Sequence, residues 1–427
     1  MSSKKIIGGC KWVIMAIVSI GVLCCMNPVL AKTYPKVKVI MMSGPELEGI
    51  KKLAELYEKK TGNTVEVEGL GFGEYHSILP IKLFAGDKSF DICWIQNTWV
   101  PEYGSAGTLE PLNEYIAATP GYEFLDYTPI ARTAGEFEGK IYALATDAHP
   151  MLLFYREDLI SKPPETWDEL FEVAKQFSRT TNPDSPTKYG ITGDYVTGEV
   201  LPQTWLNIGW SMGGDIIDKS GRVVINNEGA IEAGRYFEKL AKIGVVPPNL
   251  TQVGWDEMTR QYLDGRAAMI VPGWNAVYGS LKDKGKPLGM ALIPGTRQVD
   301  GSILRTPYCH TWNLAINASS AHKKAAWQFL KFATSKEGLA YYAKVCVGPA
   351  APPRSSVMSD LEVLSVRPDY PLLLETYKFA RYFPKVVRYG KVFEAMDKAL
   401  AEILNLRKSP EDALNAAAEE IKAALAD

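Results

Sequence analysis

The alternation of apolar and polar residues near the start of the chain predicts a strand, a helix and a second strand. Residues 37–42 form a short apolar run, and apolar residues then recur at helical spacing from Leu47 to Tyr57, up to Gly62. Residues 64–68 predict the next strand. This order is typical of a parallel sheet with right-handed crossovers, so we expect an α/β fold.

The link between that first strand and helix, Ser43-Gly44-Pro45-Glu46, has the spacing of a capping box. In a capping box the Ser side chain accepts a hydrogen bond at the start of the helix, and the Glu three residues later reaches back to it. Glu46 could instead reach a ligand cleft. Because the capping box already explains it, we predict that Glu46 caps the helix.

A second apolar strand is predicted at residues 91–95, and polar and aromatic residues follow it at once. In an open α/β sheet, ligands bind at the carboxyl ends of the strands. The amide of Asn97, the hydroxyl of Thr98 and the indole of Trp99 would suit a neutral, hydroxyl-rich ligand. We take these three as candidate ligand-binding residues, although a turn or core packing would explain them equally well.

The pattern changes near Asp147. Apolar runs at 140–144 and 151–155 predict two further strands, and Thr166 with Glu169 predicts a second capping box at the start of an amphipathic helix. The remaining predicted elements are a helix at 231–243 closed by Gly244, a strand at 267–271 that leads into Trp274, a strand at 314–317, a helix at 322–333 and a terminal helix that begins near Pro410.

Length and composition limit the kinds of protein that this chain can be. At 427 residues it is too long for one compact core, so two lobes are expected. A hydrophobic content of 46% and a charged content of 22% are those of a globular protein. The net charge of −2 provides no basic surface for nucleic acid, and we expect no nucleic-acid partner.

The first residues have the features of an export signal. Lys4, Lys5 and Lys11 precede an apolar run at 12–23, and residues 29–31 are small or aliphatic. We predict a signal peptide at 1–31 that is cleaved before Lys32, which removes three Lys and no acid and takes the net charge from −2 to −5. An uncleaved anchor is the alternative, but the apolar run is short for a membrane span.

The cysteines and histidines predict no metal site. Three of the six Cys lie in the predicted signal peptide, which leaves Cys93, Cys309 and Cys346 at wide spacing. These allow at most one disulfide, and whether Cys309 pairs with Cys346 stays open. The four His are scattered, and the Gly-rich stretch at 71–76 lacks the third Gly of a nucleotide loop and has Glu74 where phosphate would lie, so we expect neither a metal nor a cofactor.

Several strings of the chain resemble, in order, those of the extracellular solute-binding proteins of ATP-binding cassette importers, family 1, which includes maltose-binding protein. They are the stretch 83–116 with its Asp91 strand and Gly107-Thr108-Leu109, the strings 139–147, 152–159 and 164–170, the string from Tyr262 to Trp274, the strings 312–316, 324–327 and 329–330, and finally 352–355 and 412–414. Each string is a weak signal by itself, but the ordered set covers nearly all of the predicted mature chain.

The resemblance implies a two-lobed periplasmic-binding-protein fold of type II, with mixed sheets flanked by helices and a ligand cleft between the lobes. It implies crossing segments near 142–147, 312–316 and 361–368. The expected division is a signal peptide at 1–31, lobe I at 35–145 and 314–362, and lobe II at 146–313 and 363–427.

Four Trp residues are candidates for sugar stacking, because an indole offers a flat apolar partner to the C–H face of a sugar ring. Trp274 follows Pro-Gly at a strand end and matches a family position that stacks on sugar. Trp99, Trp312 and Trp205 lie in polar or strand-end contexts, where core packing is the competing explanation. By contrast, Trp167 and Trp327 are predicted to be structural.

The remaining candidates depend more on the resemblance. Asp147 matches an acidic ligand contact of the family, and a carboxylate can accept hydrogen bonds from two hydroxyls. Tyr75 follows the loop that borders the family's cleft, and Gln203 and Tyr389 lie where the second lobe contributes contacts. One departure from the family is His310-Thr311 in place of Gly-Gly, which should reshape the cleft.

We therefore expect a monomeric, non-enzymatic, periplasmic protein. It would capture a carbohydrate or polyol and deliver it, by lobe closure, to the permease subunits of an ATP-binding cassette importer. Two alternatives stay open. A non-sugar solute such as a polyol phosphate would need Arg or Lys in the cleft. A secreted glycosidase would need a second carboxylate beside Asp147, for which Glu46 and Glu74 are the candidates.

Overall fold

The computed structural model describes residues 33–282, 284–346 and 350–426, and the predicted signal peptide at 1–31 lies outside them. Most strands belong to one mixed sheet in the order β2-β1-β3-β12-β6-β8-β7, with β9 paired to β6. The bounds are β1 Val37–Met42, β2 Val65–Leu70, β3 Ile92–Gln96, β6 Ala143–Tyr155, β7 Tyr189–Thr192, β8 Ala267–Trp274, β9 Gly289–Ala291 and β12 Cys309–Ile316. Two short hairpins lie outside this sheet, β4 Glu136–Phe137 with β5 Lys140–Ile141 and β10 Thr296–Arg297 with β11 Ile303–Leu304.

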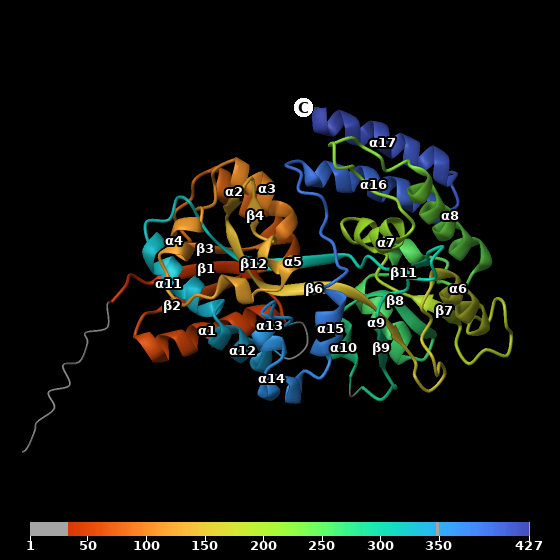
Figure 1. Ribbon diagram of the computed structural model, residues 1–427, viewed down its shortest axis with the longest axis horizontal. Helices are drawn as coiled ribbons and strands as arrows, with labels where there is room; N and C mark the ends of the chain where they lie inside the picture. Colours follow the sequence, from red (N-terminus) through yellow and green to blue (C-terminus); the bar gives the residue numbers. More distant parts are fainter. Residues whose placement is uncertain (1–32, 283, 347–349, 427) are drawn as a thin grey trace, which may run out of the picture. The chain divides into compact units, whose positions relative to one another are not determined.

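The sheet has a first half and a second half, which β6 and β12 connect (Figure 1). In the first half β1 pairs in parallel with β2 and with β3, as predicted. The strand β12 lies antiparallel between β3 and β6. Beyond Pro150, β6 leaves β12 and pairs with β8 and β9 of the second half.

Separate helices pack on the two halves of the sheet. In the first half α1 (Pro45–Thr61) contacts α11 (Lys323–Ala333) and α12 (Lys336–Val345), and α2 (Phe72–Phe84) contacts β1. In the second half α16 (Tyr389–Leu404) and α17 (Pro410–Ala426) pack against α7 (Val200–Ser211) and α8 (Glu228–Ile243) (Figure 1). The other helices are α3 Val100–Ser105, α4 Asn113–Ala117, α5 Pro129–Arg132, α6 Trp167–Gln176, α9 Trp255–Leu263, α10 Ala276–Leu281, α13 Ser355–Met358, α14 Leu361–Val366, α15 Tyr370–Thr376 and the short 3₁₀ turns Asn97–Trp99, Phe124–Asp126 and Leu250–Gln252.

The helix ends follow the predicted local chemistry in most places. Gly62 and Gly244 close α1 and α8 in the left-handed conformation, with φ of 73° at both, which only glycine adopts without strain. The hydroxyl of Thr166 accepts a hydrogen bond from the Glu169 amide at 3.2 Å, so the capping residue of α6 is confirmed. The capping box predicted at Ser43 is wrong, because α1 begins at Pro45 after Gly44 and no side chain caps it.

The two strands predicted at 140–144 and 151–155 are mostly one long strand, β6, whose residues from Ala143 to Phe154 are all buried. The predicted lobe boundaries after 145 and after 313 therefore fall inside β6 and β12, the two strands that connect the halves. The boundary after 362 falls inside α14, which packs against α12 and α13. We infer that the third connection lies later, between α15 and α16, where the backbone amide of Arg381 donates to the Pro307 carbonyl at 2.9 Å.

The three cysteines outside the predicted signal peptide are all buried and unpaired. Cys93 lies inside β3, as the sequence indicates, and Cys309 begins β12. The possible Cys309–Cys346 disulfide is therefore not formed in this structure.

Candidate functional site

A cavity of about 300 Å³ lies where the connecting strands meet the helix ends of both halves of the sheet. Its walls come from the start of α1, from β6 and β12, from the end of β8, and from α9 and α10. The lining residues are Pro45, Glu46, His149, Trp255, Trp274, Ala276, Ser280, His310 and Trp312. Such a volume is at the small end of the range of about 300–1,000 Å³ that is usual for small-molecule sites.

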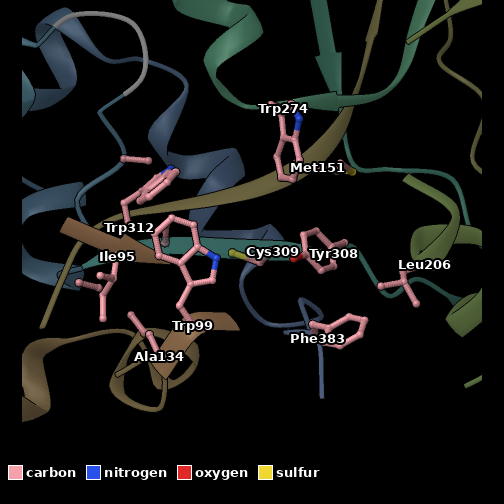
Figure 2. Close-up of a cluster of buried hydrophobic side chains, with 14 of the residues drawn as sticks. Ile95, Trp99, Ala134, Met151, Leu206, Trp274, Tyr308, Cys309, Trp312 and Phe383 are labelled. Atoms are coloured by element: carbon pink, nitrogen blue, oxygen red, sulfur yellow. The ribbon is translucent and has the colours of Figure 1, made fainter. Parts of the chain in front are cut away.

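Trp312 is held rigidly at one wall of the cavity. Its indole stacks on that of Trp94, with ring centroids 4.2 Å apart and an angle of 15° between the planes. The edge of Trp99 meets it at 5.8 Å, and Figure 2 shows the two residues beside the connecting strands. Because Trp94 covers one face and Trp312 is only 6% exposed, the indole is fixed before any ligand arrives.

Trp274 forms another wall, together with His310. β8 delivers Trp274 at its last position, opposite Met151 of β6, and Figure 2 shows the indole close to Met151. The His310 ring lies 4.6 Å from the Trp274 ring, centroid to centroid. His310 therefore fills part of the cleft, as expected from its replacement of a glycine.

The two histidines of the cavity are neutral at physiological pH. Burial lowers the pKa of His149, and burial together with the neighbouring His149 lowers the pKa of His310 well below its ordinary value. The Nδ1 of His149 donates to the Oδ1 of Asn275 at 2.9 Å, which leaves Nε2 as an acceptor. The Nδ1 of His310 has no hydrogen-bond partner among the described residues.

Glu46, predicted to cap α1, instead lines the cavity as the second residue of that helix. Burial raises the pKa of its carboxyl group, and the negative charge of Asp147 raises it further. The positive end of the α1 dipole lies at the same place and favours a carboxylate there. The sequence allowed Glu46 either to cap α1 or to reach a ligand cleft, and the structure supports the second explanation.

Asp147 lies fully buried in β6, close enough to Glu46 for their charges to interact. Its Oδ2 accepts from the Tyr342 hydroxyl at 2.9 Å, and its Oδ1 accepts from the Ala351 amide at 3.0 Å. Burial outweighs these bonds and raises the pKa of Asp147 to about 6.

This arrangement fits reversible binding of a small molecule with flat and polar faces. Three indoles supply apolar surface, two imidazoles and one carboxylate supply acceptors and donors, and among the described residues no group of three or more His, Cys, Asp or Glu could hold a metal ion. No helix in the described ranges is long and apolar enough to cross a membrane.

Comparison with known proteins identifies the family. The family described as bacterial extracellular solute-binding protein matches residues 43–340, most of the chain. The chain belongs to this family. Its members are binding proteins that lie outside the cytoplasm.

The relatives and solved structures agree with this assignment. The maltotriose-binding protein of Pyrococcus abyssi is 26% identical over 365 residues, which is 85% of this chain and 76% of that protein. A probable ABC transporter-binding protein of Deinococcus radiodurans is 25% identical over 87% of this chain and 89% of that protein. The structure of maltose-bound MalE3 from T. maritima has a TM-score of 0.80 and 26% identity, and covers 92% of this chain and 99% of that one. The predicted two-lobed α/β fold is confirmed.

The predicted site residues of this solute-binding protein fall into separate groups. Trp274 and Trp312 line the cavity, and Asp147 lies beneath it. Asn97 and Thr98 lie on the short turn after β3, where the Asn97 Oδ1 accepts from the Thr311 amide at 2.9 Å and the Thr98 hydroxyl donates to Gln96 at 3.3 Å. Asn97 thus ties this turn to β12, while Thr98 bonds to the end of β3.

Four other predicted residues lie outside the set that lines the cavity. The Tyr75 hydroxyl donates to the Trp94 carbonyl at 2.6 Å, deep in the first half, and Gln203 and Trp205 are buried in α7. The Tyr389 hydroxyl donates to Glu199 Oε1 at 3.4 Å. Whether any of them contacts a ligand stays a prediction.

Trp99 and Tyr389 belong to a second cluster that joins the two halves of the sheet. The ring of His76, on α2, lies 4.9 Å from that of Trp99, and His76 also interacts electrostatically with Glu199. Glu199 comes just before α7, and burial raises the pKa of its carboxyl group. This cluster is a contact between the halves rather than a lining of the cavity.

The sequence interpretation missed Trp255, His149 and Ser280 as cavity residues. Trp255 begins α9 directly after Gly254, a large aromatic at a helix start next to glycine, which is a signal of the kind used for Trp274. His149 lies two positions after Asp147 in β6, so strand alternation places both side chains on one face. Ser280 carried no recognisable signal.

Proposed function

We propose that this solute-binding protein binds a carbohydrate or a polyol in the cavity around Trp255, Trp274 and Trp312. It then delivers the solute to the membrane permease of an ATP-binding cassette importer. The observation that carries the proposal is the grouping of three indoles with hydrogen-bonding side chains in one small cavity. Sugar rings have an apolar C–H face and a rim of hydroxyls, and this cavity offers a partner to each.

The relatives support this choice of ligand. The Pyrococcus abyssi protein is named for maltotriose, and the T. maritima structure contains maltose. At 26% identity such a likeness does not specify the sugar, and His310 and Glu46 give the cavity of this chain its own shape and charge. We therefore propose the ligand class and leave its stereochemistry to experiment.

The two alternative functions receive less support from the site. A phosphorylated solute needs Arg or Lys, and neither occurs among the described residues that line the cavity. A glycosidase needs two carboxyl groups across the scissile bond. Both oxygens of Asp147 are occupied by Tyr342 and Ala351, and Glu74 is exposed on α2, outside the cavity lining. We propose that the protein binds its solute without chemical change.

Lobe closure is the proposed mechanism. β6 and β12 connect the halves of the sheet, and each also contributes a wall of the cavity, His149 from β6 and Trp312 from β12. A ligand that touches both halves favours the closed arrangement by the difference in its affinity for the two states. We also propose export to the periplasm through cleavage of a signal peptide at 1–31, and function as a monomer.

The test uses the protein exported by a bacterial host, with its N-terminus determined by mass spectrometry. Thermal unfolding is followed with mono-, di- and oligosaccharides, polyols, and sugar phosphates. A ligand present at 100 times its Kd adds about 2.7 kcal/mol to the free energy of unfolding, so a true ligand gives a clear rise in Tm. The sugar must be recovered unchanged.

Two variants assign any binding to the cavity. Trp255→Ala removes a half-buried indole of the cavity, and Trp327→Phe changes a buried indole in α11 that is not among the residues lining the cavity. The proposal expects the first variant to lose most of the Tm shift and the second to keep all of it. A shift produced only by phosphorylated solutes, or hydrolysis of the sugar, contradicts the proposal.

A further inference from the structure

The described residues that line the cavity carry negative charge and no cation to balance it. Among them, Glu46 is the only acidic or basic residue apart from the two histidines, which burial keeps neutral. Of the described residues, none forms an ion pair with Glu46. The positive end of the α1 dipole offsets this charge only in part, so the carboxylate favours a ligand that brings a positive charge.

The carboxylate beneath Glu46 adds to the negative potential. Asp147 is fully buried and its partners are neutral donors, the Tyr342 hydroxyl and the Ala351 amide. The cation that acts on it electrostatically, Arg367, is already neutralised, because its Nε and Nη2 donate to both oxygens of Asp369 at 2.9 and 2.7 Å. The charge of Asp147 is therefore not offset locally.

The aromatic walls suit a cation as well as they suit a sugar. The faces of Trp255, Trp274 and Trp312 are electron-rich, and cations bind to such faces within about 6 Å of the ring centre. Trp94 stacks on one face of the Trp312 indole, with ring centroids 4.2 Å apart, so a ligand can contact Trp312 only on the opposite face. A neutral sugar would stack on the indoles and donate hydrogen bonds to Glu46 without offsetting its charge, whereas a protonated amine would also offset the charge.

We propose that the solute of this protein is a saccharide with a protonated amino group, and that its ammonium group lies against Glu46 among the indoles. This inference rests on the proposed function and narrows the ligand class from carbohydrates and polyols to saccharides that carry an amino group. Binding is then electrostatic in part, so it weakens with rising salt concentration, while the binding of a neutral sugar would not.

The experiment compares matched pairs of sugars by isothermal titration calorimetry at pH 7. The pairs are glucose with glucosamine, galactose with galactosamine, mannose with mannosamine, and di-N-acetylchitobiose with its deacetylated form. In each pair that binds, we expect the amine to bind at least tenfold more tightly than its neutral partner. The advantage should shrink between 20 mM and 500 mM salt, a readout that needs no variant.

Two variants on the same helix turn provide the control. Glu46→Gln removes the cavity carboxylate and should remove the advantage of the amine over its neutral partner. Glu48→Gln removes an exposed carboxylate paired with Lys51 and should change neither. If Glu46→Gln does not fold, the effect of salt on the amine's advantage in the unmodified protein still tests the proposal.

The outcomes separate this inference from the proposed function. Neutral sugars that bind as tightly as their amines, or uronic acids that bind more tightly, overturn the charge inference and leave sugar binding in place. Binding of choline or spermidine through Glu46, with no sugar of any kind bound, overturns sugar binding and keeps the charge inference. Failure of every sugar and every cation overturns both.

Discussion

Replacing Asp147 by Asn should make the protein more stable at neutral pH, even though it removes a charge that accepts two hydrogen bonds. The carboxyl group is fully buried, and its pKa is raised to about 6 because burial disfavours the charged form more than the Tyr342 hydroxyl and the Ala351 amide favour it. The asparagine keeps nearly the same shape and an oxygen for the Ala351 amide, and it cannot ionise.

The magnitude follows from the pKa difference. An Asp in the unfolded chain has a pKa near 3.9, so folding raises it by roughly 2 units, or about 3 kcal/mol at 1.36 kcal/mol per unit. Because the folded-state pKa is the higher one, the free energy of unfolding is largest below about pH 4. It falls as the pH rises to about 6 and then stays low. The gain from Asp147→Asn should therefore grow from near zero at pH 4 to about 3 kcal/mol at pH 7.

Urea denaturation at pH 4.5, 5.5, 6.5 and 7.5 measures this gain directly. Asp264→Asn, an exposed carboxylate after α9, is the control and should give the same small difference at every pH. A variant of Asp147 that is less stable than the unmodified protein by the same amount at all four pH values would refute the reasoning. It would mean that the two hydrogen bonds offset burial, so that folding leaves the pKa of Asp147 unchanged.

Three further predictions test other parts of the structure. Trp255→Ala should weaken solute binding about 30-fold, or about 2 kcal/mol, as measured by calorimetry; an unchanged Kd would place the ligand elsewhere. Asp194→Asn should raise the urea midpoint at pH 8 but not at pH 4, because burial raises the pKa of Asp194 to about 7; equal shifts at both pH values would contradict this. Thr166→Ala should cost about 1 kcal/mol in urea unfolding through loss of the α6 cap, and a loss below about 0.3 kcal/mol would show that another group replaces it.

Much of the fold could be predicted because local signals decide it. The strand at 37–42 has the predicted bounds, since an apolar run between a charged start and a Gly-Pro turn leaves little choice. Gly62 and Gly244 end helices where only glycine fits the left-handed conformation. The long strand β6 was divided in two because His149 and Pro150 interrupt the apolar run, and only pairing with β12 on one side and β8 on the other keeps that segment extended.

The candidate site was harder to predict, because it depends on contacts between distant segments. Glu46 has the sequence of a capping residue, and only the meeting of α1 with β6 and β12 makes it a cavity residue. Tyr75 was a candidate because its stretch of sequence resembles a loop that borders the family's cleft. Its hydroxyl instead donates to the Trp94 carbonyl inside the first half. Trp274 could be predicted as a cavity residue, because it follows Pro-Gly at the end of a strand, where ligands usually bind.

An irregularity in the pairing of the two connecting strands lies beside the cavity, where it can link ligand binding to the proposed movement of the lobes. The pairing of β12 with β6 shifts after Trp312, which is opposite Asp147, so that Asn313 is opposite Ala145 and Thr146 is the extra residue. The Thr146 hydroxyl donates to the Trp312 carbonyl at 3.1 Å and accepts from the Trp94 indole at 3.1 Å. It thus bonds to the backbone of the cavity residue and to the ring on which that residue stacks.

A β-bulge bends and twists a strand locally, and here Asp147 of β6 and Trp312 of β12 are the pair of residues directly beside it. Any change in the angle between the lobes that bends β6 and β12 at this point must move the Trp312 indole and the Asp147 carboxylate together. A ligand that packs against Trp312 therefore also favours one bend of these strands, which is what coupling between binding and closure requires.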